Sequence, residues 1–370
     1  MKIAVIKETR INENRVAITP QVAAQLIKSG YSIMVEPNAG YNSNFNDEAY
    51  KQAGCEIGSK QDILAKCNLM VKVNLPTDEE INMLSEGAAT ISFLYATINK
   101  DLVEKLASKK ITAFSMDAIP RISRAQNMDA LSSQANLAGY KSVILGANHL
   151  GKIFPLLMTS AGTITPAKVL IYGAGVAGLQ AIATAKRLGA VVECTDVRPE
   201  TKEQVESLGG KFIEVKGAEA AKVEGGYAKE VSADYLQKQK EAVDKSLFAA
   251  DLVITTALVM GRKAPVLITE EQVKQMKLGS VIVDMAAEQG GNCELTELDK
   301  VVVKHGVTIV GQSNLPSTLA QNASELYAKN IQNLLNHLAT PQGFKFETEE
   351  EITKGTLITH QGNILNSTLR

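Results

Sequence analysis

The sequence predicts an α/β protein of two domains, each with a parallel sheet, joined by two long helices around a cleft. The chain has 370 residues, which exceeds the size of one ordinary hydrophobic core. Strand and helix patterns alternate from the first residues onward, as in a parallel sheet covered on both faces. Two long helical patterns, at residues 129–150 and 317–338, separate the central part of the chain from its ends.

The first third of the chain is expected to form an α/β domain of its own. Its strand patterns lie at residues 3–7, 31–36, 69–73, 90–95 and 112–116, and its helical patterns at 20–29, 47–53 and 102–109. We place this domain at residues 1–130 and return the C-terminal tail, 317–370, to it. The second domain then comprises residues 131–316.

The second domain contains a complete nucleotide-binding unit. After an apolar strand pattern at residues 169–172, the G-x-G-x-x-G pattern is filled by Gly173, Ala174, Gly175, Val176, Ala177 and Gly178. The first glycine permits a tight turn, the second lets a pyrophosphate approach the backbone, and the third lets the next helix press on the sheet. That helix, at residues 179–188, presents its amides to the phosphates. The combination predicts a Rossmann-like domain that binds a dinucleotide.

An acid near the end of the next strand indicates which dinucleotide binds. Residues 191–197 form the strand pattern, and Asp196 lies about 20 residues after the glycines. A carboxylate at this place accepts both ribose hydroxyls of an adenosine and repels a 2′-phosphate. Val197 and Arg198 follow, and an arginine here can accommodate a 2′-phosphate. The acid is the stronger signal, so the sequence favours NAD(H) over NADP(H).

Two later stretches of this domain are candidates for nucleotide contacts. Ala257 and Leu258 follow a strand pattern at residues 251–256, and ligands of open α/β sheets bind at the carboxyl ends of strands. Further strand patterns lie at residues 211–215, 280–284 and 308–310. The polar residues 216–245 carry Gly225, Gly226 and Tyr227. A lid that closes over bound nucleotide and a solvated helical hairpin explain this stretch equally well.

Composition and charge argue against several classes of protein. The net charge of −1 provides no basic field for nucleic acid or an anionic membrane. The N-terminus lacks a signal-peptide pattern, and no apolar stretch reaches the roughly 18 residues of a membrane span. The four cysteines are scattered, so we expect reduced thiols and no metal site.

A polar segment precedes the first long helix. It contains Arg121, Gln126, Asp129 and Ser132, and helical spacing places the last two on one face at the helix start. Their donors and acceptors suit a carboxamide, the group that a nicotinamide ring carries. A capped helix N-terminus, with Asp129 as first-turn acid and Arg121 as its surface partner, explains the same residues. Residue chemistry alone leaves both interpretations open.

Several long motifs resemble one family. They are R-I-S-R-A-Q-N-M-D-A-L-S-S-Q-A-N-L-A-G-Y at 121–140, the glycine unit at 173–190, T-D-V-R at 195–198, E-N-R-V-A at 13–17 and V-D-M-A-A-E-Q-G-G-N at 283–292. These motifs resemble the NAD(H)-binding component (alpha subunit, domain I) of proton-translocating NAD(P) transhydrogenase, and the resemblance covers nearly the whole chain.

The resemblance implies roles for the candidate residues. In such a protein Arg121, Gln126, Asp129 and Ser132 surround the nicotinamide, Asp196 holds the adenosine ribose, and Tyr227 lies on a mobile loop over the nucleotide.

It also implies a reaction and partners. Members of the family pass hydride directly from NADH, bound here, to NADP⁺ on an NADP(H)-binding beta subunit, with Re/Si specificity. The transfer is coupled to proton translocation through a membrane-spanning subunit. The implied arrangement is a cytoplasmic homodimer, held by partner subunits on the inner face of the bacterial cytoplasmic membrane.

Alanine dehydrogenase shares these motifs and is the competing interpretation. Arg15 and Lys72 match positions that hold substrate in that enzyme, but Tyr95 replaces its catalytic histidine and Glu288 its aspartate. Hydride transfer between two nicotinamides needs alignment and no general acid or base, which favours the transhydrogenase. A non-catalytic NADH sensor is the third alternative.

Overall fold

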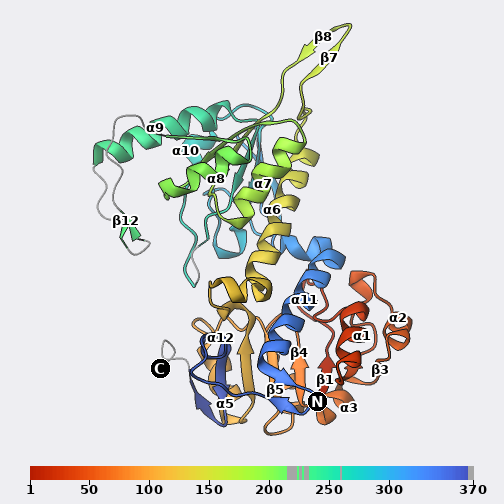
Figure 1. The fold of residues 1–370 in the computed structure, drawn as a ribbon. Helices are drawn as coiled ribbons and strands as arrows, with labels where there is room; N and C mark the ends of the chain where they lie inside the picture. Colours follow the sequence, from red (N-terminus) through yellow and green to blue (C-terminus); the bar gives the residue numbers. More distant parts are fainter. Residues whose placement is uncertain (215–222, 225–226, 229–232, 259–260, 366–370) are drawn as a thin grey trace. The chain divides into compact units, whose positions relative to one another are not determined.

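The computed structural model describes residues 1–214, 223–224, 227–228, 233–258 and 261–365 (Figure 1). The chain divides into two compact units. Unit 1 comprises Met1–Gln134 and the return segment from Pro316, and unit 2 comprises Ala135–Leu315. Each unit contains a sheet of mainly parallel strands, which confirms the predicted α/β class. Helix α6 (Ala130–His149) begins in unit 1 and continues in unit 2.

Unit 1 is built on an eight-stranded sheet of order β21-β20-β6-β5-β4-β1-β2-β3. Its strands are β1 (Lys2–Val5), β2 (Ser32–Val35), β3 (Glu56–Ile57), β4 (Leu69–Val71), β5 (Ala89–Ser92), β6 (Thr112–Ser115), β20 (Leu357–His360) and β21 (Asn363–Ile364). The strands from β6 to β3 are parallel, whereas β20 pairs antiparallel with β6 and β21 with β20.

Helices cover both faces of this sheet. They are α1 (Pro20–Lys28), α2 (Asp47–Gln52), α3 (Lys60–Lys66), α4 (Asp78–Met83), α5 (Lys100–Ser108), α11 (Ala320–Leu338) and α12 (Glu351–Thr356). Alternate strand residues enter different cores, because successive side chains of a strand point to opposite faces. Ile3 and Val5 pack in a core with α1 and α11, whereas Ala4 packs in a core with α3, α4 and α5.

Unit 2 is built on a seven-stranded sheet of order β11-β10-β9-β14-β15-β17-β16. Its strands are β9 (Lys168–Tyr172), β10 (Val191–Thr195), β11 (Lys211–Phe212), β14 (Leu252–Thr255), β15 (Val281–Asp284), β16 (Val301–Lys304) and β17 (Val307–Val310). The strand order reverses direction at β9, so β10 and β14 flank it and leave a topological switch point at its carboxyl end.

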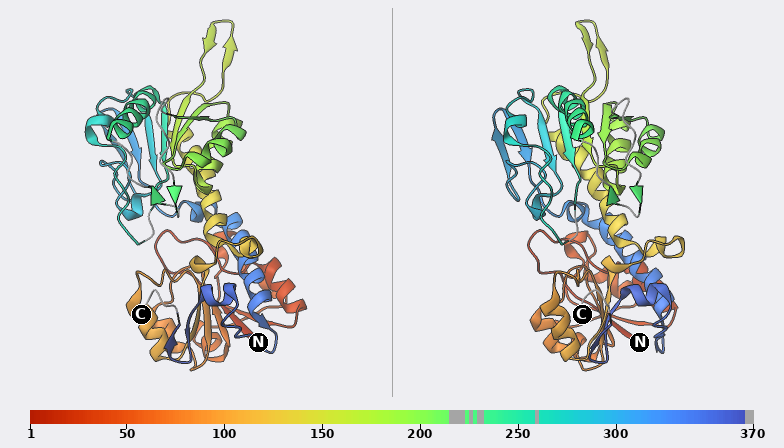
Figure 2. Two further views of the ribbon diagram at one scale, coloured as in Figure 1. Left: turned by 60° about the vertical axis from the view of Figure 1, so that its left-hand side comes forward. Right: turned by 90° about the vertical axis from the view of Figure 1, so that its left-hand side faces the viewer.

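The faces of the unit 2 sheet are covered by different helices, which can be followed in Figure 2. Its helices are α7 (Val176–Arg187), α8 (Lys202–Ser207), α9 (Ala233–Ala249), α10 (Glu270–Val273) and most of α6. Ile171 packs in a core with α6 and α7, whereas the adjacent Leu170 packs in a core with α9. The sheet is therefore buried on both faces, as a doubly wound fold requires.

Several features differ from the sequence-based expectations, among them α3, α4 and α8, which were not predicted, and α7, which begins at Val176 and not at residue 179. The hairpin of β7 (Leu157–Thr159) and β8 (Gly162–Ile164) was not predicted, and it projects from unit 2 in Figure 1. The antiparallel strand β16 was also not predicted. It pairs with β17 through a two-residue turn, in which His305 and Gly306 both have positive φ. The valine-rich runs on both sides of this turn were the sequence signal for the hairpin. The helix expected at residues 317–338 begins at Ala320, because the preceding turn (Leu315–Leu319) is a 3₁₀ helix.

A buried ion pair links β4 to α4 in unit 1. The Lys72 ammonium lies 2.9 and 2.7 Å from the two carboxylate oxygens of Glu80, and both side chains are inaccessible to solvent. Glu80 also accepts a hydrogen bond from the Thr77 amide and completes a capping box at the start of α4. One carboxylate thus neutralises a buried cation and caps a helix.

We expect Glu80→Ala to lower the free energy of unfolding by about 3–5 kcal/mol, because it leaves Lys72 buried without its main partner. Urea unfolding measures the loss. The control is Asp78→Ala on the same helix, which removes an exposed ion pair with Lys105 and should cost at most about 1 kcal/mol. Equal losses in the two variants would contradict a special role for the buried pair.

Candidate functional site

The glycine-rich turn lies at the switch point of the unit 2 sheet, between β9 and α7. Gly173 has φ of +100°, and a Cβ there would lie 2.4 Å from the Thr256 hydroxyl oxygen. A Cβ on Gly178 would lie 1.8 Å from the Gly173 carbonyl oxygen. A Cβ on Gly175 would meet no atom of the described residues within 4 Å. Two glycines are therefore required by the fold itself, and the third borders open space.

Helix α7 begins at this open space. Its N-cap is Gly175, and no side chain among the described residues caps the helix. The first amides of a helix have no partner within the helix, and they carry the positive end of its dipole. Val176 is exposed and Ala177 is half-buried in the first turn. The start of α7 can therefore accept an anion against its backbone.

Asp196 and Arg198 form an ion pair beside this turn. The Asp196 carboxylate accepts hydrogen bonds from the Ala174 amide at 2.6 Å and from the Arg198 amide at 2.8 Å. Arg198 also donates from Nε and Nη2, each at 3.0 Å. Burial opposes ionisation of Asp196, but these hydrogen bonds outweigh it and hold the pKa of the carboxyl below its usual value. The carboxylate is aimed at the turn and covered by its own arginine.

Exposed apolar side chains follow three adjacent strands at this edge. Val176 follows β9, Val197 follows β10 and Leu258 follows β14, and all three are exposed. The strands are neighbours and run parallel, so their carboxyl ends share one edge of the sheet. Exposed apolar side chains around a glycine turn suit a flat ring with polar edges.

A buried carboxylate, that of Asp284 in the V-D-M-A-A-E-Q-G-G-N motif, organises the neighbouring loops, and it was not among the candidate site residues. Asp284, at the end of β15, accepts hydrogen bonds from the amides of Ala286, Asn292 and Cys293 and from the hydroxyls of Thr255 and Thr296. It is inaccessible to solvent. A carboxyl group that accepts this many hydrogen bonds has its hydrogen-bonding capacity satisfied within the protein.

Asn292 transmits this order to the segment after β14. Its side chain accepts from the Ala257 amide at 3.1 Å and donates to the Ala257 and Pro265 carbonyls at 2.9 and 2.8 Å. Thr256, the residue before, donates its hydroxyl to the Tyr172 carbonyl at 2.9 Å. The hydrogen bonds of Asn292 to the Ala257 backbone, and that of Thr256 to the Tyr172 carbonyl, thus hold Ala257 next to the glycine turn. Asn292 is the last residue of the E-Q-G-G-N motif, and this position in the motif was the feature of the sequence that could have identified it.

The polar segment from Arg121 to Ser132 lies in unit 1. Residues Ser123–Met128 form a 3₁₀ helix, labelled η3, and α6 starts at Ala130. Arg121 and Gln126 are exposed. The Asp129 carboxylate accepts hydrogen bonds from the Ser132 amide at 2.9 Å and the Ser132 hydroxyl at 2.6 Å. Asp129 and Ser132 therefore form a helix cap, and the structure brings them together as the spacing predicted.

Unit 1 also gathers charged side chains at the carboxyl edge of its sheet. Arg15 donates to both carboxylate oxygens of Glu13, at 2.8 and 2.7 Å, and to the Gln134 amide oxygen at 3.0 Å. Burial opposes ionisation of Glu13, but Arg15 and Asn74 outweigh it and lower the pKa of Glu13 to about 2. Burial raises the pKa of nearby Glu8, and the Lys72 charge only partly offsets it.

Tyr95 follows β5 at the same edge and adopts a left-handed conformation with φ of 43°. Asp117 accepts from the amides of Leu94 and Tyr95, at 2.8 and 3.0 Å, and holds this turn. Glu288, the other residue that departs from the alanine dehydrogenase pattern, is exposed in unit 2.

The stretch predicted as a lid or hairpin is only partly described by the structure. Tyr227 lies in the short strand β13 (Tyr227–Ala228), which pairs with β12 (Val223–Glu224), and residues 233–245 belong to α9. The rest of residues 216–245 lies outside the described residues. The choice between the two interpretations stays a prediction.

The four cysteines are buried and reduced. Burial raises the pKa of the Cys194 thiol to about 12 and that of the others to about 11. Among the residues that the structure describes, no cluster of His, Cys, Asp and Glu has the geometry of a metal site. Within the same residues no helix is long and apolar enough to cross a membrane.

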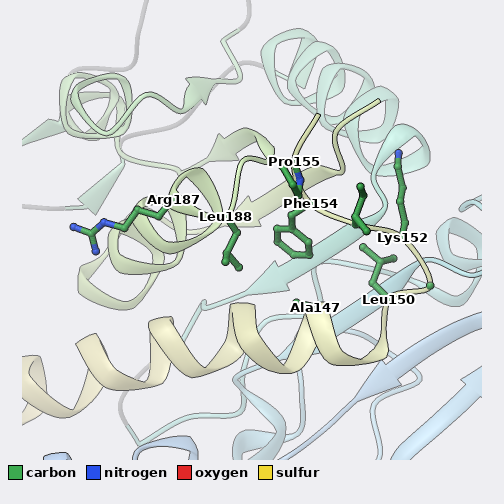
Figure 3. Close-up of a pocket in the computed structure, with 9 residues that line it drawn as sticks. Ala147, Leu150, Lys152, Phe154, Pro155, Arg187 and Leu188 are labelled. Atoms are coloured by element: carbon green, nitrogen blue, oxygen red, sulfur yellow. The ribbon is translucent and has the colours of Figure 1, made fainter. Parts of the chain in front are cut away.

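A pocket of about 750 Å³ opens in unit 2 at the other end of α7 from the glycine turn (Figure 3). It is lined by Ala147, Leu150, Gly151, Lys152, Ile153, Phe154, Pro155, Arg187 and Leu188. Since α7 has 12 residues, at about 1.5 Å per residue, the pocket lies roughly 18 Å from the glycine turn. It is separate from the dinucleotide edge, and it adjoins the base of the β7–β8 hairpin.

Comparison with known proteins confirms the resemblance. The alanine dehydrogenase/PNT N-terminal domain matches residues 4–138, and the alanine dehydrogenase/PNT C-terminal domain matches residues 142–367. The first part of the NAD(P) transhydrogenase alpha subunit of Rhodospirillum rubrum is 50% identical over 383 residues, which cover 100% of this chain and 99% of that protein. Alanine dehydrogenase 2 of Staphylococcus aureus is 32% identical over 383 residues, covering 99% and 95%.

A solved structure agrees with these relatives. The transhydrogenase of Sinorhizobium meliloti superimposes with a TM-score of 0.90 at 42% identity, over 98% of this chain and 100% of that chain. The chain therefore belongs to the alanine dehydrogenase/PNT family of nicotinamide nucleotide oxidoreductases.

Proposed function

We propose that this chain is the NAD(H)-binding alpha subunit of a proton-translocating NAD(P) transhydrogenase. In this reaction, hydride passes from C4 of NADH on this chain directly to C4 of NADP⁺ on a beta subunit. The transfer has Re/Si specificity and is coupled to proton translocation through a membrane-spanning subunit. The chain is then cytoplasmic, attached through its partners to the inner face of the bacterial cytoplasmic membrane.

One observation supports the choice of reaction: Tyr95, not histidine, follows β5 at the carboxyl edge of the unit 1 sheet, the edge at which Arg15 and Lys72 also lie. The four histidines, all within the described residues, lie elsewhere: His149 at the end of α6, His305 in a turn, His337 on α11 and His360 on β20. A reaction that protonates or deprotonates substrate needs a positioned acid or base. Direct hydride transfer between two nicotinamides needs none, so this edge supports the transhydrogenase reaction.

The dinucleotide site that we propose uses the open space at Gly175. Because no atom in the described part of the chain lies within 4 Å of a Cβ built there, a pyrophosphate can approach the backbone and the first amides of α7. Asp196 would accept the ribose hydroxyls once Arg198, whose side chain is 48% exposed, moves aside. The Asp196 side chain is 5% exposed, so the ribose hydroxyls would replace the hydrogen bonds that the arginine side chain donates to it. Val197, Arg198, Ala257 and Leu258 would border the adenosine, and Tyr227 would close over the nucleotide.

In this proposal Arg121, Gln126, Asp129 and Ser132 contact the nicotinamide. Arg121 and Gln126 are exposed and supply a cation and an amide, while Asp129 and Ser132 form a rigid cap between them and α6. Their role is to orient the carboxamide and so fix the face of the ring from which hydride leaves. Alignment and exclusion of water are the contributions that this reaction requires of the protein.

Alanine dehydrogenase is the second candidate, because Arg15 and Lys72 lie at the carboxyl edge where substrate would be held. A single experiment separates the candidates. The purified chain is mixed with a transhydrogenase NADP(H)-binding component and NADH, and reduction of thio-NADP⁺ is followed. The same chain is tested separately with alanine and NAD⁺.

We expect transfer only in the mixture. NAD⁺ reduction with alanine would overturn the proposal in favour of the dehydrogenase. NADH binding without either activity would leave the non-catalytic sensor as the remaining interpretation.

Two glycine variants test the nucleotide site. We expect Gly175→Ala to raise the Kd for NADH at least about tenfold, since its Cβ would enter the space for pyrophosphate. Its free energy of unfolding should fall by at most about 1 kcal/mol, the effect of losing a glycine N-cap. Gly178→Ala should instead unfold more easily by about 3 kcal/mol or more, because its Cβ meets a backbone oxygen. Fluorescence titration of NADH and urea unfolding distinguish the two effects.

We also propose that the homodimer forms through the β7–β8 hairpin. All residues from Pro155 to Thr165 are exposed, and they include Leu156, Leu157, Met158 and Ile164. An isolated two-stranded hairpin is marginally stable in water, so a second copy that covers these side chains would stabilise it. The apolar pocket of Figure 3, at the hairpin base, would extend the buried surface.

Met158→Asp is therefore expected to shift the chain from dimer to monomer in size-exclusion chromatography with light scattering. Met158 is 76% exposed within one chain. The matched control is Leu278→Asp, at a leucine that is 86% exposed elsewhere in unit 2, and it should leave the mass unchanged. If the Met158→Asp variant still had the mass of a dimer, the interface would lie elsewhere on the chain.

A further inference from the structure

A buried asparagine on α11 holds the segment that we propose to align the nicotinamide. Asn330 is 7% exposed, and both ends of its amide are used. Its Nδ2 donates to the Asn127 carbonyl at 2.8 Å, and its Oδ1 accepts from the Ser133 hydroxyl at 2.8 Å. Both partners belong to the Arg121–Ser133 stretch, 203 and 197 residues earlier in the chain.

These two contacts span a break in the helical backbone. Asn127 lies in the last turn of η3, and Ser133 lies in the first turn of α6. Asp129, between them, has φ of −70° and ψ of 90°, which belongs to neither helix. Rotation about the Asp129 bonds would swing η3 relative to α6. Asn330 joins both sides of this junction and so opposes that rotation.

The junction determines where Gln126 lies. Gln126 is exposed, so no packing of its own side chain fixes its position. Its backbone neighbours Ala125 and Met128 are buried in the unit 1 core, which anchors η3 on one side. Asn330 holds the polar side of η3, because it donates a hydrogen bond to the carbonyl of Asn127, the residue after Gln126.

Other contacts to η3 are weaker in kind. Asn333 also donates to the Asn127 carbonyl, at 3.0 Å, but its side chain is only half-buried and this contact is open to solvent. Arg124 pairs with Glu350 at 2.8 Å, with the arginine side chain 55% exposed. Solvated contacts of this kind contribute little, whereas a buried amide with two partners leaves unpaired groups when it is lost. Asn330 thus provides the buried polar contacts that hold this segment.

We propose that Asn330 is a positioning residue for hydride transfer, which acts by fixing Gln126 and the Asp129–Ser132 cap through Asn127 and Ser133. The inference rests on the proposed function. It assigns a catalytic consequence to the C-terminal return segment, which contains none of the residues that carry the family motifs. A misplacement of about 1 Å in aligning groups can slow a reaction by as much as 10²-fold.

The test compares Asn330→Asp, Ser133→Ala, Gln126→Ala and the control Asn333→Ala. Asn330→Asp has the same shape and keeps an acceptor for Ser133, but it turns an oxygen toward the Asn127 carbonyl in place of a donor. Ser133→Ala breaks the other contact and leaves Asn330 intact. Each full-length variant is assayed for NADH affinity, for thermal unfolding and for single-turnover hydride transfer with the NADP(H)-binding component.

We expect Asn330→Asp and Ser133→Ala to slow hydride transfer about 10- to 100-fold with the Kd for NADH changed less than about threefold. Asn333→Ala should slow transfer less than about threefold. The double variant Gln126→Ala with Asn330→Asp should be no slower than the slower single variant, because both changes act on one alignment.

The possible failures are distinguishable. If Gln126→Ala leaves transfer unchanged, the nicotinamide assignment of the proposed function fails, and this inference fails with it. If Gln126→Ala slows transfer but Asn330→Asp and Ser133→Ala do not, only the positioning role is overturned. The positioning role would also be overturned if Asn330→Asp lost transfer only in proportion to its loss of NADH affinity or of folded protein. The same holds if the double variant were slower than either single variant by the product of the two effects.

Discussion

The close approach of Gly178 to the Gly173 carbonyl oxygen is the constraint on which the nucleotide edge depends. A Cβ at residue 178 would lie 1.8 Å from that oxygen, so only glycine lets α7 start directly behind the turn. Gly173 in turn leaves no room for a Cβ against the Thr256 hydroxyl, which is bonded to the Tyr172 carbonyl. The turn after β9 and the loop after β14 are therefore interlocked. Their arrangement leaves the space at Gly175 open.

The open edge is supported from behind by buried polar side chains. Asp284 collects amide and hydroxyl donors, and Asn292 holds Ala257 by its backbone amide and carbonyl. In unit 1, Asn330 holds the Asn127 carbonyl and the Ser133 hydroxyl in a similar way. Such groups are costly to bury unless they are fully bonded, so their contacts also specify a single loop conformation. Alignment of a substrate depends on rigid backbone of this kind.

Electrostatics in unit 1 complete this arrangement. Arg15 is paired with Glu13 and Lys72 with Glu80, all of them buried. The charges at this edge are thus balanced largely within the protein and stabilise the ends of β4 and its neighbours. Near the start of α6, Arg121 and Gln126 are exposed. In the proposed function these groups orient an amide, and a reaction in which only hydride changes place requires no group that moves protons.

The sequence by itself determined the class of fold and the identity of the nucleotide unit. Local chemistry is sufficient there: a strand, three glycines and a helix follow one another directly, and Asp129 caps the helix that contains Ser132 only three residues later. The β7–β8 hairpin was missed because its residues bury nothing within the chain, and no hydrophobic periodicity marks a strand pair that leaves all its side chains exposed.

Only the tertiary structure decided which distant residues support the site. Asp196 and Arg198 were read separately from the sequence, yet they form one ion pair that covers the carboxylate. Asn292 binds the backbone of Ala257, which lies 35 residues earlier in the chain. Asn330 binds the carbonyl of Asn127, which lies 203 residues earlier. Hydrogen bonds across such separations depend on how strands and helices pack, and neither residue type nor spacing encodes them locally.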